Sequence, residues 1–115
     1  MAFIDNDILT YEQLNALKEI KNKINNKFKI ENIVLYGSAV RKEMDEESDI
    51  DLLIVTRAPL PRKVRHEITD IVFDVNLKYD TNYSTLVVDK NSWENGPYSI
   101  LPIHDEIEKE GVVYE

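Results

Sequence analysis

Residues 35–55 read LYGSAVRKEMDEESDIDLLIV and contain two polar pairs, Gly37-Ser38 and Asp49-Ile50-Asp51. On a β-strand the carboxylates of Asp49 and Asp51 would project from the same face, because side chains alternate along a strand. Two carboxylates gathered at one point are costly unless a cation is held there, and oxygen ligands of this kind suit Mg²⁺. Gly37 lets the backbone approach a phosphate closely, and Ser38 adds a hydroxyl. A phosphate cradle beside a metal site is typical of phosphoryl or nucleotidyl transfer.

The flanking patterns predict how this stretch is built into a fold. The apolar run before Gly37 predicts a β-strand over 30–36, and the unbroken run 52–55 predicts a strand over 49–55 that is buried on both faces. Thr10 and Gln13 form a capping-box signature at a helix start, and Pro61 suits the first turn of a helix that runs to about Tyr79. The other expected elements are a short helix or turn at 38–44, a strand at 83–88, a helix at 102–109 and a last strand or tail at 111–114. This order predicts an α+β fold, a small mixed β-sheet with helices packed on it.

Composition bounds the class of protein. The chain of 115 residues is expected to form one domain over 1–115, and its 43% hydrophobic and 31% charged residues are ordinary for a globular protein. No apolar run approaches the roughly 20 residues that span a bilayer, and no leader pattern opens the chain. The absence of cysteine fits a reducing cytoplasm. A net charge of −8 argues against general nucleic-acid binding, because an acidic chain repels a phosphate backbone.

The stretch Leu35 to Val55 resembles the signature of the DNA polymerase β-like nucleotidyltransferase superfamily. Within it, the chain is most similar to the minimal nucleotidyltransferase (MNT) family, whose pattern is Gly-Ser, a ten-residue gap (39–48 here) and Asp-x-Asp. Arg41 matches the arginine of the family's Gly-Ser-x-x-Arg, and the closing residues 110–114 resemble the end of such domains. The resemblance implies the polymerase β-like nucleotidyltransferase fold.

The resemblance also implies an activity. Asp49 and Asp51 would be catalytic and would bind Mg²⁺, with two ions expected, while Gly37 and Ser38 would hold the phosphates of a nucleoside triphosphate, with Arg41 neutralising charge. A nucleoside monophosphate, AMP from ATP in our interpretation, would pass to an acceptor hydroxyl. Similar minimal domains are antitoxins whose partner is a helical HEPN-type toxin, so the expected acceptor is a tyrosine on such a partner.

The third carboxylate of the family pattern is not evident. Active members carry another Asp or Glu on the following strand, but the strand predicted at 83–88 contains none. Asp80 just before it is the preferred substitute, since the start of a strand can lie beside the Asp49–Asp51 end of an antiparallel neighbour. Asp89 is expected to be a turn residue at the opposite end, and Asp74 lies upstream in the helix. The register decides between them.

Two other functions stay open. A binding or regulatory module that keeps the fold but has lost transfer is favoured by the missing carboxylate. Transfer to a small-molecule acceptor would need an added domain or a pocket made by a dimer, so a homo-oligomer is left open.

Several further residues are equally or better explained by structural or surface roles than by a functional one. Arg41 is equally well explained by pairing with Glu43 or Asp45. His66 and His104 are expected to be ordinary surface residues, and Trp93 and Tyr98 to be packing groups. The one basic cluster fits a contact with triphosphate or a partner, or a solvated helix start: Arg57, Arg62, Lys63 and Arg65.

Overall fold

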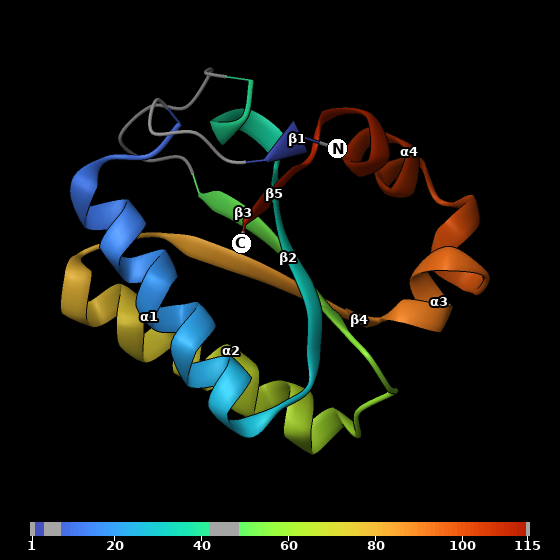
Figure 1. Cartoon of the computed structure of the whole chain (residues 1–115), viewed down its shortest axis with the longest axis horizontal. Coiled ribbons are helices and arrows are strands. Elements are labelled where there is room, and N and C mark those ends of the chain that lie inside the picture. The colour runs from blue at the N-terminus through green and yellow to red at the C-terminus, as the bar shows by residue number, and fades with distance from the viewer. Residues whose placement is uncertain (1, 4–7, 42–48, 115) are drawn as a thin grey trace.

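In the computed structural model, which describes residues 2–3, 8–41 and 49–114, one five-stranded mixed sheet carries helices on both faces (Figure 1). The strand order is β1-β5-β2-β3-β4. The strands are β1 (Ala2–Phe3), β2 (Ile30–Tyr36), β3 (Ile50–Thr56), β4 (Tyr83–Asp89) and β5 (Val112–Tyr114). The helices are α1 (Tyr11–Lys27), α2 (Arg62–Tyr79), α3 (Lys90–Glu94) and α4 (Pro102–Glu110), with 3₁₀ turns η1 (Gly37–Ala39) and η2 (Pro97–Ile100). The predicted α+β class is confirmed.

The two faces of the sheet bury separate cores because side chains alternate along β3. Leu52 and Ile54 pack with the apolar faces of α1 and α2, whereas Leu53 and Val55 pack with Trp93 and the α4 side chains. All four of these β3 residues are almost fully buried. The prediction of a strand buried on both faces is therefore confirmed.

Helix α1 begins at the predicted cap. The Thr10 hydroxyl accepts a hydrogen bond from the Gln13 amide, and the Gln13 side chain accepts one from the Thr10 amide, which completes the capping box. Pro61 stands at the N-cap position of α2, one residue ahead of the helix start.

The pairing of β3 with β4 corrects one expectation. These strands are parallel, with Asp51 opposite Ser84, and not antiparallel. The reason is the connection between the strands. Helix α2 runs antiparallel to β3 and carries the chain back to the end of the sheet at which β3 begins, so β4 starts there and runs parallel to β3. Strand β3 is antiparallel to β2 on its other side, where Tyr36 pairs with Asp51. The starts of β3 and β4 therefore lie together.

Some elements were not foreseen. The short helix α3 follows β4 directly, and β1 adds to the sheet beside β5. Of the short helix or turn expected at 38–44, η1 and a turn to Arg41 are described, and residues 42–48 lie outside the described part. His104 is also less exposed than expected, because its side chain is 17% exposed and its ring lies 4.5 Å from the Trp93 ring.

Candidate active site

Gly37 brings the Gly37-Ser38 pair next to the Asp49-Ile50-Asp51 pair. Strand β2 ends at Tyr36, and Gly37 turns the chain with a φ of 79°, in the left-handed region that favours glycine. A Cβ atom placed on Gly37 would collide with the Asp51 carboxylate oxygen Oδ2. The glycine therefore allows a close approach of the backbone to Asp51 that no other residue type would permit. The predicted neighbourhood of Gly-Ser and Asp-x-Asp is present in the fold.

Asp51 lies half-buried in a negative environment. Burial raises the pKa of the Asp51 carboxyl first, the charges of Asp49 and Glu106 raise it further, and the charge of Arg41 opposes them. The pKa of the neighbouring Tyr36 hydroxyl is raised as well, by burial and then by the charges of Asp51 and Glu106. The charges of Asp49 and Glu106 thus both act on Asp51, and negative charge gathered in this way is costly without a cation.

The donor set fits a hard divalent cation. Asp49 is exposed at the mouth of β3 and Asp51 is half-buried behind it, so the two offer carboxylate oxygens of the kind that Mg²⁺ binds while leaving positions for water and phosphate. Among residues 2–3, 8–41 and 49–114 there is no cluster of three Asp, Glu, His or Cys side chains placed to hold a metal. The carboxylates that the described residues bring together for a metal are therefore those of Asp49 and Asp51.

Arg41 is held by the C-terminal helix. Its Nη1 atom donates to Oε1 of Glu106 at 2.9 Å and to Oε2 of Glu110 at 3.1 Å. Glu106 and Glu110 stand one turn apart on α4, which places both on one side of that helix. The alternative partners named from sequence, Glu43 and Asp45, lie outside the described residues. Sequence reasoning missed both α4 glutamates, since nothing local indicates that α4 ends beside η1.

The candidates for a third carboxylate lie in different places. Asp80 is exposed and ends α2 in the left-handed conformation, with φ 55°. Asp89 pairs in register with Thr56 at the far end of β4, the opposite end that was expected. It is the N-cap of α3, accepting a hydrogen bond from the Ser92 amide, and not the turn residue that was predicted. The β4 residue opposite Asp51 is Ser84. Asp80 as the third carboxylate stays a prediction.

Asn76 holds the start of β4 in place beside the start of β3, where Asp51 lies. Its side-chain carbonyl accepts hydrogen bonds from the Tyr83 amide at 2.9 Å and the Thr81 hydroxyl at 2.9 Å, and its amide donates to the Tyr83 carbonyl at 3.0 Å. The Ile50 amide in turn donates to the Asn82 carbonyl at 2.8 Å. One side chain on α2 thereby sets the position of β4 relative to Asp51.

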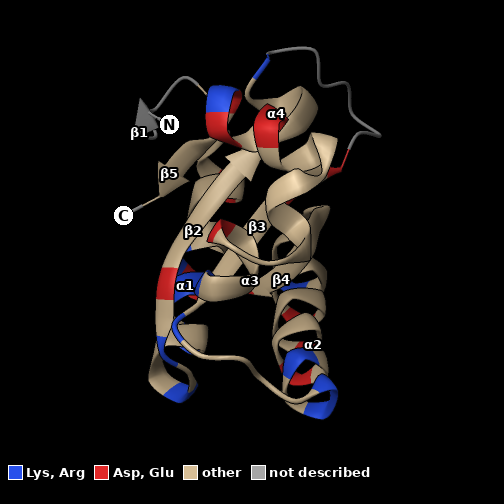
Figure 2. Ribbon diagram, turned by 90° about the vertical axis from the view of Figure 1, so that its right-hand side faces the viewer, with Lys and Arg blue, Asp and Glu red and all other residues tan. Residues whose placement is uncertain are grey.

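Two adjoining pockets run along the outer side of β4. The first has a volume of ≈ 400 Å³ and has Asp49, Asn82 and Ser84 in its wall. The second, of ≈ 290 Å³, is lined by arginine side chains from the start of α2. Both pockets share Thr69 and Thr85. Acidic side chains gather around α4, and basic ones at the opposite end, where α2 begins (Figure 2).

Comparisons with known proteins show the family of the chain. The family model for the nucleotidyltransferase domain matches residues 17–114, so the chain belongs to that family. A Methanocaldococcus jannaschii protein named "Putative protein adenylyltransferase MJ0141" is 35% identical over 81 residues, which is 69% of this chain and 82% of that protein. The family and its relatives make this protein a transferase enzyme of the nucleotidyltransferase class, as predicted.

Solved structures share the fold. The "Crystal structure of a putative nucleotidyltransferase from Sulfolobus solfataricus at 1.40 A resolution" has a TM-score of 0.56 and 22% identity, covering 87% of this chain and 77% of that one. The "Crystal structure of the toxin-antitoxin with AMP-PNP" has a TM-score of 0.59 and 18% identity, covering 90% and 72%. At these identities the likeness is one of fold. None of the described helices is long and apolar enough to cross a bilayer.

Proposed function

We propose that this protein is an Mg²⁺-dependent adenylyltransferase that moves AMP from ATP to a hydroxyl on a partner protein, in an antitoxin role toward a HEPN-type toxin. The observation that carries the proposal is the contact between the Gly37 backbone and the Asp51 carboxylate, with Asp49 beside it. The names of the relatives support the chemistry, since one is called a protein adenylyltransferase and one structure is a toxin–antitoxin with AMP-PNP.

The residues of the site would act as follows. Gly37 and Ser38 would bind the β- and γ-phosphates at η1, and Arg41 would neutralise their charge. Asp49 and Asp51 would hold Mg²⁺, which when bound supplies positive charge to the triphosphate and to the leaving pyrophosphate. The acceptor oxygen attacks the α-phosphorus as the bond to the β-phosphate oxygen breaks, and Asp80 is our candidate to take the acceptor proton.

The test is transfer of an adenylyl group. The protein is incubated with ATP, Mg²⁺ and the protein encoded by its neighbouring gene, and intact mass is measured for both chains. We expect one adenylyl group on the partner, and none with Asp49→Asn/Asp51→Asn. Glu67→Gln/Asp70→Asn is the matched control, because it removes two exposed charges from α2 and should leave transfer intact. A partner that gains no mass while a known adenylyltransferase modifies its own substrate contradicts the proposal.

A nucleotide-binding module without transfer is the second candidate. The observation that favours it is Ser84, which stands opposite Asp51 where an acid would complete the site. Calorimetric binding of ATP with Mg²⁺, without pyrophosphate release in the presence of the partner, would support this function over the first.

A further inference from the structure

Strand β4 has an open outer edge. It is the last strand of the sheet, and its even-numbered residues direct their backbone groups toward β3, as the bond from the Ile50 amide to the Asn82 carbonyl shows. The odd-numbered residues therefore direct theirs outward. The Asn76 side chain makes hydrogen bonds with the outward amide and carbonyl of Tyr83. The backbone amides and carbonyls of Thr85 and Val87 are the next ones directed toward the outer edge. This is a short stretch at which another strand can pair.

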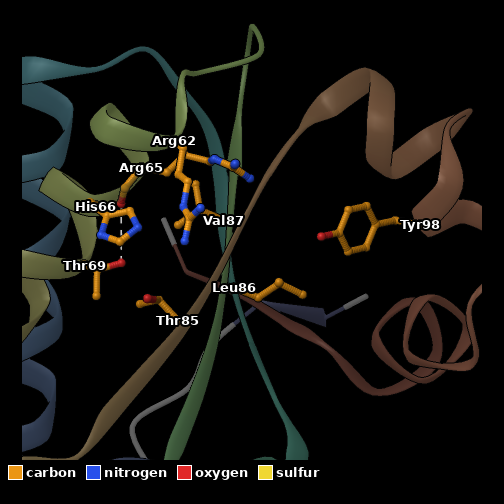
Figure 3. A pocket seen from close by; sticks show the side chains of 8 residues that line it. All are labelled: Arg62, Arg65, His66, Thr69, Thr85, Leu86, Val87 and Tyr98. Atoms are coloured by element: carbon orange, nitrogen blue, oxygen red, sulfur yellow. Dashed lines mark hydrogen bonds between the residues drawn. The ribbon is translucent and has the colours of Figure 1, made fainter.

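A basic pocket lies directly over this edge. Thr85 and Val87 line it, Arg62, Arg65 and His66 reach it from α2, and Tyr98 closes it from η2. Figure 3 shows the two arginines and Tyr98 on opposite sides of β4, with the Tyr98 hydroxyl turned toward the strand. The pocket of ≈ 290 Å³ has room for a side chain together with a segment of backbone.

The positive charge of the pocket is available to a ligand. Neither Arg62 nor Arg65 takes part in an ion pair with any described residue, although the chain carries a net charge of −8. Elsewhere, Arg41 and Arg57 are both paired with glutamates. The charge of Arg65 does act on the Asp89 carboxylate, although the two form no ion pair. Two arginines at an open strand edge match a carboxylate carried by an extended peptide.

The pocket is continuous with the proposed active site. The pocket that contains Asp49 shares Thr69 and Thr85 with it, so both belong to one groove along β4. Ser84 stands opposite Asp51, and Val87 lies three residues further along the strand, a rise of roughly 10 Å. An acidic side chain in the basic pocket would thus sit roughly 10–16 Å from an acceptor hydroxyl at the carboxylates, or about three to five residues of extended chain.

We infer that this groove binds the acceptor: an extended segment of the partner protein adds to the edge of β4, with an acidic side chain held by Arg62, Arg65 and His66. The inference rests on the proposed function for the identity of the acceptor. A peptide fits better than a nucleic acid, because the edge offers backbone hydrogen bonds in strand geometry and the surrounding chain is acidic. The acceptor hydroxyl would lie about four residues from the acid.

Binding is tested with a synthetic peptide on the full chain. The probe is a fluorescein-labelled peptide of alternating Thr and Val with one Glu and, about four residues away, one Tyr. We expect saturable binding by anisotropy, weakened at least about tenfold by Arg62→Gln/Arg65→Gln or by Glu→Gln in the peptide. Arg57→Gln/Lys63→Gln removes the same charge outside the pocket and should change affinity little. N-methylation of alternate peptide amides should also weaken binding about tenfold.

The outcomes separate this inference from the proposed function. Equal affinity of the pocket variant and its charge-matched control overturns the inference, as does tighter binding of a short single-stranded oligonucleotide than of the peptide. Adenylylation of the partner at an unchanged rate in Arg62→Gln/Arg65→Gln also overturns it while leaving the proposed function standing. Pocket-dependent peptide binding with no AMP transfer by the native chain supports the groove and contradicts the proposed function instead.

Discussion

At the scale of single residues, the site depends on a glycine that no side chain can replace. Gly37 combines a left-handed backbone with contact to Asp51, and each property alone disfavours a Cβ atom. The sequence predicted the glycine's closeness to phosphate, but its contact with a carboxylate needed the pairing of β2 with β3.

Gly37→Ala should destabilise the fold by about 1–3 kcal/mol and abolish ATP binding, because it adds backbone strain and drives Asp51 aside. Chemical denaturation and calorimetry with ATP and Mg²⁺ measure the two effects. In Gly37→Ala/Asp51→Ala the collision is relieved, so stability should recover in part while binding stays lost. Strictly additive losses of stability in the double variant would show that the contact does not matter.

The raised pKa of Asp51 predicts a pH-dependent cost of folding. A carboxyl whose folded pKa lies above its unfolded value binds more protons when folded, so its contribution to stability falls as pH rises through that interval. Asp51→Asn should therefore raise Tm at pH 7, and the gain should vanish below pH 3.8, the ordinary pKa of an aspartate side chain. Mg²⁺ at pH 7 should raise Tm of the native chain and not of Asp51→Asn. The reverse order of Tm values at pH 7 would contradict the unfavourable charge at this position.

At the scale of elements, the crossover through α2 places β4 where the site needs it. Asn76, near the end of α2, makes three hydrogen bonds with Thr81 and Tyr83 at the start of β4. These bonds fix the register of β4 against β3. The sequence predicted both elements, whereas the role of Asn76 depends on a turn whose geometry no local pattern specifies.

Asn76→Ala should cost about 2–4 kcal/mol of unfolding free energy, because it leaves partly buried backbone groups of Tyr83 without partners. Urea denaturation followed by circular dichroism gives the value. Asn76→Asp can still accept from the Tyr83 amide and the Thr81 hydroxyl but cannot donate to the Tyr83 carbonyl, so its loss should be intermediate. A native-like midpoint for Asn76→Ala would exclude the fastening role.

Asp80 offers a test of the third carboxylate that leaves the helix end intact. Asn tolerates the left-handed conformation that Asp80 adopts, so Asp80→Asn removes the charge and should preserve the cap. If Asp80 takes the acceptor proton, adenylyl transfer should fall by about 10²–10⁴-fold while ATP affinity stays unchanged. Full transfer by Asp80→Asn would leave that proton to another group.

At the scale of the whole molecule, the motif is completed by residues from the far end of the chain. Local patterns were enough for β2, β3, α1 and α2, since hydrophobic periodicity and caps are local signals. The orientation of β4 and the contact of α4 with Arg41 are long-range, and they escaped prediction for that reason. The carboxylate pair was found because its spacing is local, and Glu106 was missed because its approach to Asp51 depends on tertiary packing.

Glu106 and Glu110 allow this long-range coupling to be measured. Both pair with Arg41, but only Glu106 contributes to the raised pKa of Asp51. In Glu106→Gln the pKa of Asp51, followed by carboxyl NMR, should fall toward its ordinary value, whereas Glu110→Gln should change it little. Each variant should cost less than about 1 kcal/mol of stability, because these ion pairs are exposed.

The same pair of variants tests whether α4 tunes nucleotide binding. Glu106→Gln removes one ion pair of Arg41 and lowers the negative potential where the triphosphate would bind. This variant should therefore bind ATP with Mg²⁺ several-fold more tightly than the native chain. Glu110→Gln removes one ion pair of Arg41 without lowering the negative charge that acts on Asp51, so its gain should be smaller. Calorimetry at low ionic strength should resolve the order, and added salt should compress it as the charges are screened. Equal affinities for all three chains would confine the role of α4 to packing against the sheet.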